Sequence, residues 1–82
     1  MKYRIEFKPR ALKDSRKISK VQLAHLFEQI ENISDGLKGD VKRLTNFTPE
    51  YRLRVGDYRI LFEIEGEKLI IYRIRHSKDA YK

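Results

Sequence analysis

Strict alternation of apolar and basic residues between positions 51 and 62 constrains the fold more than any other part of the chain. The segment reads YRLRVGDYRILF, and its apolar side chains recur at every second position on either side of Gly56-Asp57. Successive side chains of a strand point to opposite faces of a sheet. The spacing therefore predicts two strands joined by a tight turn. Their sheet has one apolar face, and the opposite face carries Arg52, Arg54 and Arg59.

Three arginines crowded on one open face repel one another, so this face calls for an anionic partner. The planar guanidinium group matches phosphate oxygens in pairs, which makes phosphate the expected ligand. The whole chain is also basic, with a net charge of +7 and a pI near 9.8. Such a balance favours a polyanion such as nucleic acid, the ribosome or an anionic membrane. Composition alone leaves open a protein that is merely soluble and basic, or one that binds an acidic protein.

Length and composition predict a single domain over residues 1–82. The chain has no cysteine, which excludes disulfides, thiolate metal sites and cysteine nucleophiles. The sequence shows no metal-ligand cluster, paired-carboxylate site, serine–histidine–acid set or phosphate-binding glycine loop, so we expect neither a metal nor a cofactor. The first residues do not resemble a signal peptide, and no apolar run approaches the roughly 20 residues that span a bilayer. We therefore expect a cytoplasmic protein.

The segments before the central strands predict one strand and two helices. Residues 2–7 alternate as a strand, and a short helix with Leu12 among its inward residues follows from about residue 9 to residue 18. Ser19 and Gln22 have the spacing of a capping box, which starts a second helix after a very tight turn. That helix carries an apolar stripe at helical spacing, made of Leu23, Leu26, Phe27, Ile30 and Ile33.

The last strand is expected over residues 68–75, after an irregular segment at 37–50 and the two central strands. The turn before it could hold two or three residues. That choice sets the face of Arg73 and Arg75, and the sequence leaves it open. The predicted fold is α+β: an N-terminal strand, an antiparallel helical hairpin, then a three-stranded antiparallel meander. Both helices cover one face of a four-stranded sheet.

Several stretches of the sequence resemble the RelE/ParE superfamily of bacterial and archaeal type II toxins. They are Lys42-Arg43-Leu44, residues 51–59, and Ile74-Arg75-His76-Ser77-Lys78-Asp79-Ala80-Tyr81. The opening of the chain also fits, so the resemblance covers essentially all of it. It implies the α+β fold described above. Members of the RelE branch cleave messenger RNA in the ribosomal A site, whereas members of the ParE branch poison DNA gyrase.

The resemblance also implies roles for particular residues, because RelE-like enzymes use a basic cluster on the sheet and a tyrosine near the C-terminus. The implied catalytic residues are Arg52, Arg54, Arg59, His76 and Tyr81. The implied contacts with RNA or the ribosome are Lys42, Arg43, Arg73, Arg75 and Lys78. RelE-type enzymes often have lysines on the first central strand. This chain has arginines, which stay protonated and cannot act as bases.

Proton transfer must therefore come from another side chain. His76 is the expected proton carrier because its reference pKa of about 6.5 is close to neutrality. Tyr81 is the other candidate, either stacked on a base or exchanging a proton if its cationic surroundings lower its pKa.

The function implied by the resemblance is a metal-independent endoribonuclease. The 2′-hydroxyl of the RNA would attack the neighbouring phosphodiester while the protein moves protons and stabilises charge. The implied partners are the ribosome, messenger RNA and an acidic or amphipathic antitoxin that wraps the toxin. Two alternatives remain: a ParE-like gyrase inhibitor, and a weakly catalytic member that chiefly binds its antitoxin.

Overall fold

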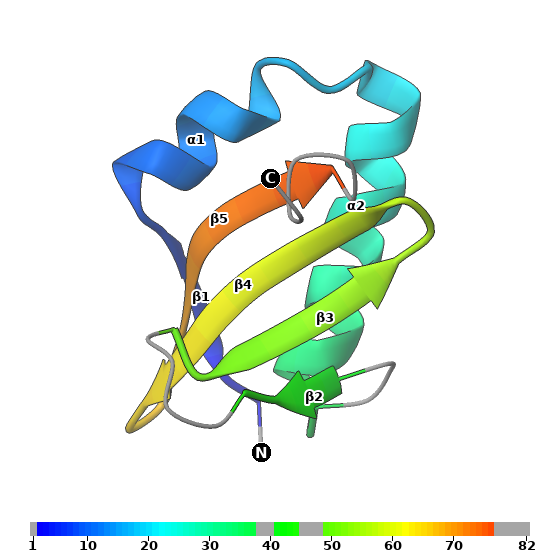
Figure 1. The fold of residues 1–82 in the computed structure, drawn as a ribbon. Coiled ribbons are helices and arrows are strands. Elements are labelled where there is room, and N and C mark those ends of the chain that lie inside the picture. Colours follow the sequence, from blue (N-terminus) through cyan, green and yellow to red (C-terminus); the bar gives the residue numbers. More distant parts are fainter. Residues whose placement is uncertain (1, 38–40, 45–48, 77–82) are drawn as a thin grey trace.

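The computed structural model of the chain describes residues 2–37, 41–44 and 49–76. Within these residues it forms two helices and one five-stranded sheet (Figure 1). In chain order the elements are β1 Arg4–Phe7, α1 Pro9–Ser15, α2 Lys20–Ser34, β2 Val41–Arg43, β3 Tyr51–Val55, β4 Tyr58–Glu65 and β5 Lys68–His76. The predicted α+β fold is confirmed, with one strand more than expected. Neither helix is long and apolar enough to cross a membrane.

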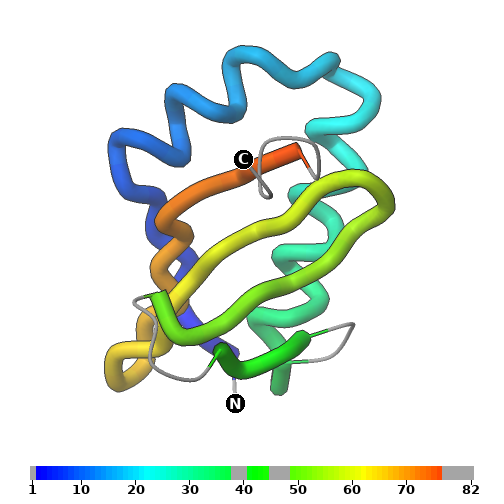
Figure 2. Tube along the Cα trace, viewed as in Figure 1, coloured from blue at the N-terminus to red at the C-terminus, as the bar shows by residue number. Residues whose placement is uncertain are grey.

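The strands lie in the order β1-β5-β4-β3-β2. The first strand is parallel to the last, and every other neighbouring pair is antiparallel. Figure 2 shows this path, with the blue trace of β1 beside the lower part of the orange trace of β5. The first strand thus closes one edge of the meander formed by the last three strands.

Strand β2 is the element that the sequence did not reveal. It pairs with the free edge of β3, and it places Lys42 opposite Arg52. Three residues are too few to show the alternation of a strand. This strand therefore forms because the backbone N–H and C=O groups of β3 pair with it, and not because of its own sequence. The prediction of four strands was wrong for this reason.

The core lies between the helices and the apolar face of the sheet, and in Figure 1 α2 lies behind the sheet. Its buried members are Ala11, Leu26, Ile30, Ile33, Leu53, Val55, Ile60, Phe62, Leu69, Ile71 and Ile74. Fully burying one such large side chain stabilises the fold by about 1.5–3 kcal/mol. Four of these residues come from the central strands: Leu53, Val55, Ile60 and Phe62. Their burial confirms the predicted apolar face of β3 and β4.

The helix boundaries follow local hydrogen bonding. Ser19 caps α2, with its Oγ accepting a hydrogen bond from the Gln22 N–H at 3.3 Å. The first helix ends earlier than expected because the N–H groups of residues 16–18 donate to carbonyls three residues back, a tighter turn than the α-helix.

Leu12 and Phe27 were expected to face inward, but they are 48% and 39% exposed. Both lie on the flank of their helix, where a periodic pattern does not separate core from rim.

A bulge decides which face Arg73 and Arg75 occupy. The two-residue turn between β4 and β5 would by itself place Arg73 opposite Ile60, on the helix side. A register shift next to Leu61 moves the pairing by one residue, so Arg73 lies opposite Leu61 and Arg75 opposite Arg59. A shift of one residue moves a side chain to the other face. The bulge therefore adds both arginines to the face away from the helices.

Candidate nucleic-acid interface

Three arginines on three neighbouring strands form a row across the face away from the helices. Arg54 of β3 is directly opposite Arg59 of β4, which is directly opposite Arg75 of β5. We call these three residues the arginine ladder. Directly opposed residues in a sheet have Cβ atoms about 4.5–5.5 Å apart, and like charges at that spacing are destabilising. An anion bound over the ladder would turn this repulsion into attraction.

A second row lies beside the ladder. Lys42 of β2 is opposite Arg52, which is opposite Leu61, which in turn is opposite Arg73. Within the described residues the buried Nε of Arg52 makes no hydrogen bond. The two rows together make up the basic face, and they confirm the predicted orientation of the arginines of β3 and β4.

The acidic residues of this sheet face lie at its other end. Glu63 and Glu65 follow further along β4, and Glu6 of β1 forms an ion pair with Lys68 at 3.5 Å. The positive charge is therefore concentrated near the turn between β3 and β4. A ligand phosphate would be drawn to that end of the sheet.

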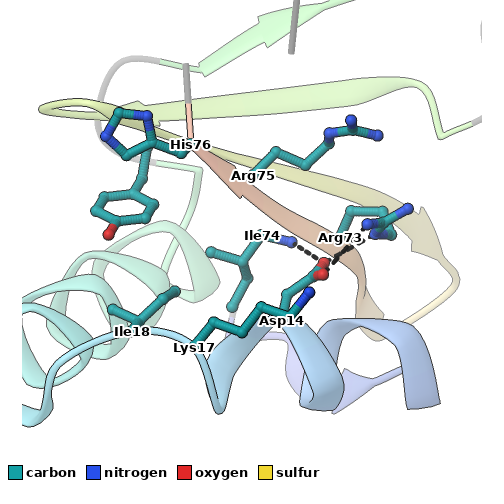
Figure 3. Close-up of a pocket in the computed structure, with 8 residues that line it drawn as sticks. Asp14, Lys17, Ile18, Arg73, Ile74, Arg75 and His76 are labelled. Atoms are coloured by element: carbon teal, nitrogen blue, oxygen red, sulfur yellow. Dashed lines mark hydrogen bonds and ion pairs between the residues drawn. The ribbon is translucent and has the colours of Figure 1, made fainter. Parts of the chain in front are cut away.

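Asp14 holds the open edge of β5 beside this face. Its Oδ2 accepts hydrogen bonds from Arg73 Nε at 2.8 Å and from the Ile74 N–H at 3.0 Å, and its Oδ1 accepts one from Arg73 Nη2 at 3.2 Å (Figure 3). Burial raises the pKa of the Asp14 carboxyl, but these hydrogen bonds and the nearby positive charges outweigh it and hold that pKa below its ordinary value. The hydrogen bond to Asp14 raises the pKa of Arg73.

His76 does not lie on the basic face. It is opposite Tyr58, whose side chain is on the same face of β4 as the buried Ile60 and Phe62. The rings of His76 and Tyr58 meet edge to face with centroids 5.2 Å apart. The Tyr58 hydroxyl in turn donates to Gln22 Oε1 of α2 at 2.9 Å. The structure thus places the expected proton carrier on the helix side of the sheet, whereas the side chains of the arginine ladder belong to the opposite face.

A hollow of about 540 Å³ lies between the end of α1 and the end of β5 (Figure 3). His76, Arg75 and Lys17 contribute to its lining, together with the Asp14–Arg73 pair. It adjoins the edge of the sheet at which the arginine ladder ends.

The remaining candidates are less closely grouped. Arg43 is opposite Tyr51, so it does not belong to the basic face. It forms an exposed ion pair with Glu50 at 3.4 Å. Lys78 and Tyr81 lie outside the described residues. Among the residues that are described, no three His, Asp or Glu side chains gather as a metal site would require.

Sequence reasoning missed Asp14 altogether. It stands within the segment RALKDSRK, surrounded by basic residues of the first helix. One acid in a basic run is a signal for an ion pair, but its partner is 59 positions further along the chain. The bulge that sets the sheet face of Arg73 has no local signature in the sequence either.

The chain is similar to known proteins in sequence and in fold. The family described as the ParE toxin of the type II toxin–antitoxin system, parDE, matches residues 5–81. The putative toxin RelE1 of Methanocaldococcus jannaschii is 31% identical, and the match covers 100% of this chain and 98% of that protein. Toxin RelE3 of the same organism is 40% identical over 53 residues, which cover 65% of this chain and 60% of RelE3.

A solved structure extends the likeness to the fold. The toxin chain compared in the RelB–RelE antitoxin–toxin complex from Methanococcus jannaschii superposes with a TM-score of 0.78 at 29% identity, over 93% of this chain and 94% of that one. Family match, relatives and fold agree on one class of protein, the toxins of type II toxin–antitoxin systems. Within that class the chain belongs to the RelE/ParE superfamily and is RelE-like, which confirms the resemblance seen in its sequence.

Proposed function

We propose that this toxin is an endoribonuclease that cuts messenger RNA on the ribosome and binds the scissile phosphate at the arginine ladder. The observation that carries the proposal is the direct opposition of Arg54, Arg59 and Arg75 on three adjacent strands. Such a row offers several guanidinium groups to one phosphate and its neighbours. Its place of action would be the cytoplasm, where translated messages are found.

The chemistry needs no nucleophile from the protein. The RNA 2′-oxygen attacks the adjacent phosphorus, the bond from phosphorus to the 5′-oxygen breaks, and a 2′,3′-cyclic phosphate and a 5′-hydroxyl end result. One group must take the 2′-hydroxyl proton, and one must protonate the departing oxygen. The arginines remain charged throughout, so their role is to stabilise the negative charge that builds up on the phosphate oxygens. One well-placed donor contributes about 3–4 kcal/mol to such stabilisation.

Proton transfer is assigned to Tyr81 in this proposal. His76 is turned toward Tyr58 and α2, whereas the phosphate is expected over the opposite face. Tyrosine has a reference pKa of about 10 and requires positive surroundings to ionise near neutrality. The arginine ladder and Lys78 supply such charge if the tail reaches the basic face.

The proposed protein partner is a cognate antitoxin. The RelE toxin from Methanococcus jannaschii was solved as a complex with RelB, and the basic face of this chain suits a segment that carries carboxylates. Such a segment laid across the arginine ladder would block the phosphate site. Lys42 and Arg52 would extend the contact with either the antitoxin or the RNA, whereas the guanidinium group of Arg73 is bonded to Asp14.

Inhibition of DNA gyrase is a second candidate, because the matching family is described by the ParE toxin. The position of His76 also favours it, since one side chain suited to nuclease chemistry is directed away from the basic face. On this alternative the arginines would bind acidic groups of the target without any bond being broken.

Brief induction of the toxin separates these functions. Primer extension on translated messages reports cleavage, and gyrase-linked double-strand breaks report poisoning. Cuts confined to translated regions within minutes support the proposal. Breaks with intact messages would move the function to gyrase, and the absence of both would leave antitoxin binding as the main activity.

A further inference from the structure

Among the residues that the structure describes, the end of β5 has a strand neighbour on one side, which is β4. Residues Arg4–Phe7 of β1 pair with Lys68–Ile71, and the pairing stops there. From Arg73 to His76, the strand that pairs with β5 in the described part of the chain is β4. Backbone donors on its other side need acceptors from elsewhere.

Helix α1 covers this open edge and supplies an acceptor. The Asp14 carboxylate takes the hydrogen bond from the Ile74 N–H that a further strand would otherwise take. The side chain is only 14% exposed, so water competes poorly for the same donor. A helix laid over a sheet edge also prevents pairing with another chain.

Both oxygens of the same carboxylate accept hydrogen bonds from Arg73. The two hydrogen bonds of 2.8 and 3.2 Å are a bidentate pair, the geometry that fixes a guanidinium group in both position and plane. By register Arg73 belongs to the basic face, yet its guanidinium is bonded to the carboxylate on α1 at the edge of the sheet (Figure 3). One acid therefore anchors a backbone group and a side chain at consecutive positions of β5.

Arg75, the last rung of the arginine ladder, lies one residue beyond this double anchor. The ends of strands open more readily than their paired middles. We propose that Asp14 is a positioning residue: by holding Ile74 and Arg73 it fixes the end of β5, and with it the place of Arg75 over the substrate phosphate. The inference rests on the proposed ribonuclease function.

Removing the Asp14 carboxylate should therefore lower the rate of RNA cleavage and leave the binding of RNA nearly unchanged. Arg52, Arg54 and Arg59 lie on other strands and would still attract RNA if the end of β5 were loosened. The misplaced guanidinium would stabilise the transition state less, because a displacement of about 1 Å in a reacting site can cost about 10²-fold in rate.

The test compares wild type, Asp14→Ala, Asp14→Asn and the control Glu28→Gln, which removes an exposed carboxylate of α2. Asn retains an oxygen for the Ile74 N–H, so this variant keeps the fold accessible if Asp14→Ala is poorly folded. Hydrogen exchange at the amides of Ile74 and Arg75 reports the anchor directly. Single-turnover cleavage on programmed ribosomes, measured over a range of ribosome concentrations, reports the rate and the half-saturating concentration separately.

In Asp14→Ala we expect amide exchange at residue 74 to rise at least about tenfold while that of Ile60 stays unchanged. We also expect the saturating cleavage rate to fall about 10–10²-fold with little change in the half-saturating concentration. In both measurements Asp14→Asn should lie between wild type and Asp14→Ala, and Glu28→Gln should match wild type. An unchanged saturating rate in Asp14→Ala, or a change in half-saturation alone, overturns the proposal.

The two hypotheses fail separately in this experiment. If wild type does not cut, the proposed function is wrong and the positioning of a scissile phosphate falls with it. The exchange data still show whether Asp14 holds β5. Equal exchange at residue 74 in wild type and in both Asp14 variants overturns the anchor itself.

Discussion

At the scale of single residues, the chemistry of the basic face is set by arginine rather than lysine. Each rung of the ladder carries a guanidinium group that stays charged at any accessible pH and offers donors in a flat fork. Arg54, Arg59 and Arg75 can therefore hold phosphate oxygens but cannot move protons. The proposed function therefore needs another side chain for proton transfer. The strand register places His76 on the helix side, opposite Tyr58.

Arg59 is the middle rung, with an arginine opposite it on each side. We expect Arg59→Ala to lower the single-turnover cleavage rate by about 10²–10³-fold, the effect of removing one well-placed donor to a developing negative charge. Arg10→Ala is the control, since it removes the same charge from an exposed position on α1. Equal losses in the two variants would show that overall charge, and not the ladder, supports cleavage.

The pH dependence of cleavage separates the two proton-transfer candidates. We expect Tyr81→Phe to lose about 10²-fold or more in rate, and His76→Gln to cut within a few-fold of wild type. The positive surroundings proposed for Tyr81 lower the pKa of its hydroxyl from the reference value of about 10, and a tyrosine base then predicts a wild-type rate that still rises above pH 7. A histidine base predicts a plateau above about pH 7. A plateau that disappears in His76→Gln would return the role to His76.

At the scale of elements, the sequence predicts those parts whose signal is local. The alternation in residues 51–62 predicted the central hairpin, its buried face and the opposite orientation of its arginines, and the structure agrees. Strand β2 could not be predicted because three residues show no period. The bulge next to Leu61 could not be predicted either, since it depends on how two strands fit together. The Asp14–Arg73 pair joins residues 59 positions apart, so no local pattern could reveal it.

The anchor at Asp14 should show in the pH dependence of stability. The pKa of its carboxyl is lower in the folded protein than in the unfolded chain, so the folded state binds fewer protons and this contribution is fully present above about pH 4, the ordinary aspartate range. Asp14→Asn should lower the free energy of unfolding by about 1–3 kcal/mol at neutral pH. The difference from wild type should shrink as the pH falls through the folded-state pKa.

Urea unfolding at a series of pH values measures this difference. Glu28→Gln, on the exposed side of α2, should change the unfolding free energy by less than about 0.5 kcal/mol at every pH. A gap between wild type and Asp14→Asn that stays constant down to pH 2 would show that its charge does not contribute.

The turn that sets the register of β4 and β5 depends on Gly66. Its φ is +60°, in the left-handed region, and a Cβ added there would meet nothing within 4 Å. The cost of Gly66→Ala is therefore conformational, and we expect the unfolding free energy to fall by about 1–2 kcal/mol. Gly66→Asn should lose less, because asparagine tolerates this region better. Thermal or urea unfolding measures both variants, and equal losses would point to a cause other than backbone conformation.

At the scale of the whole molecule, the net charge of +7 is unevenly distributed over the sheet. The arginine ladder and Arg52 lie at the end near the turn between β3 and β4, whereas Glu63, Glu65 and Glu6 lie toward the other end. On the proposed function, long-range attraction would bring RNA or an acidic partner to the protein, and the local row of guanidinium groups would decide where it binds. The dependence of the binding affinity on salt concentration separates these two contributions, because only direct phosphate contacts release condensed counterions from the RNA.

Binding of a fluorescent single-stranded RNA, measured by anisotropy over a range of salt concentrations, should follow this distinction. For single strands, each phosphate contact adds about 0.7 to the slope of log affinity against log salt. We expect Arg54→Ala, which removes an exposed rung of the ladder, to make the slope shallower by about that amount. Arg10→Ala should leave the slope unchanged, because this residue lies on α1 and contributes only to the long-range field. If both variants shift the slope equally, the RNA is held by diffuse charge over the whole surface, and the arginine ladder is not its binding site.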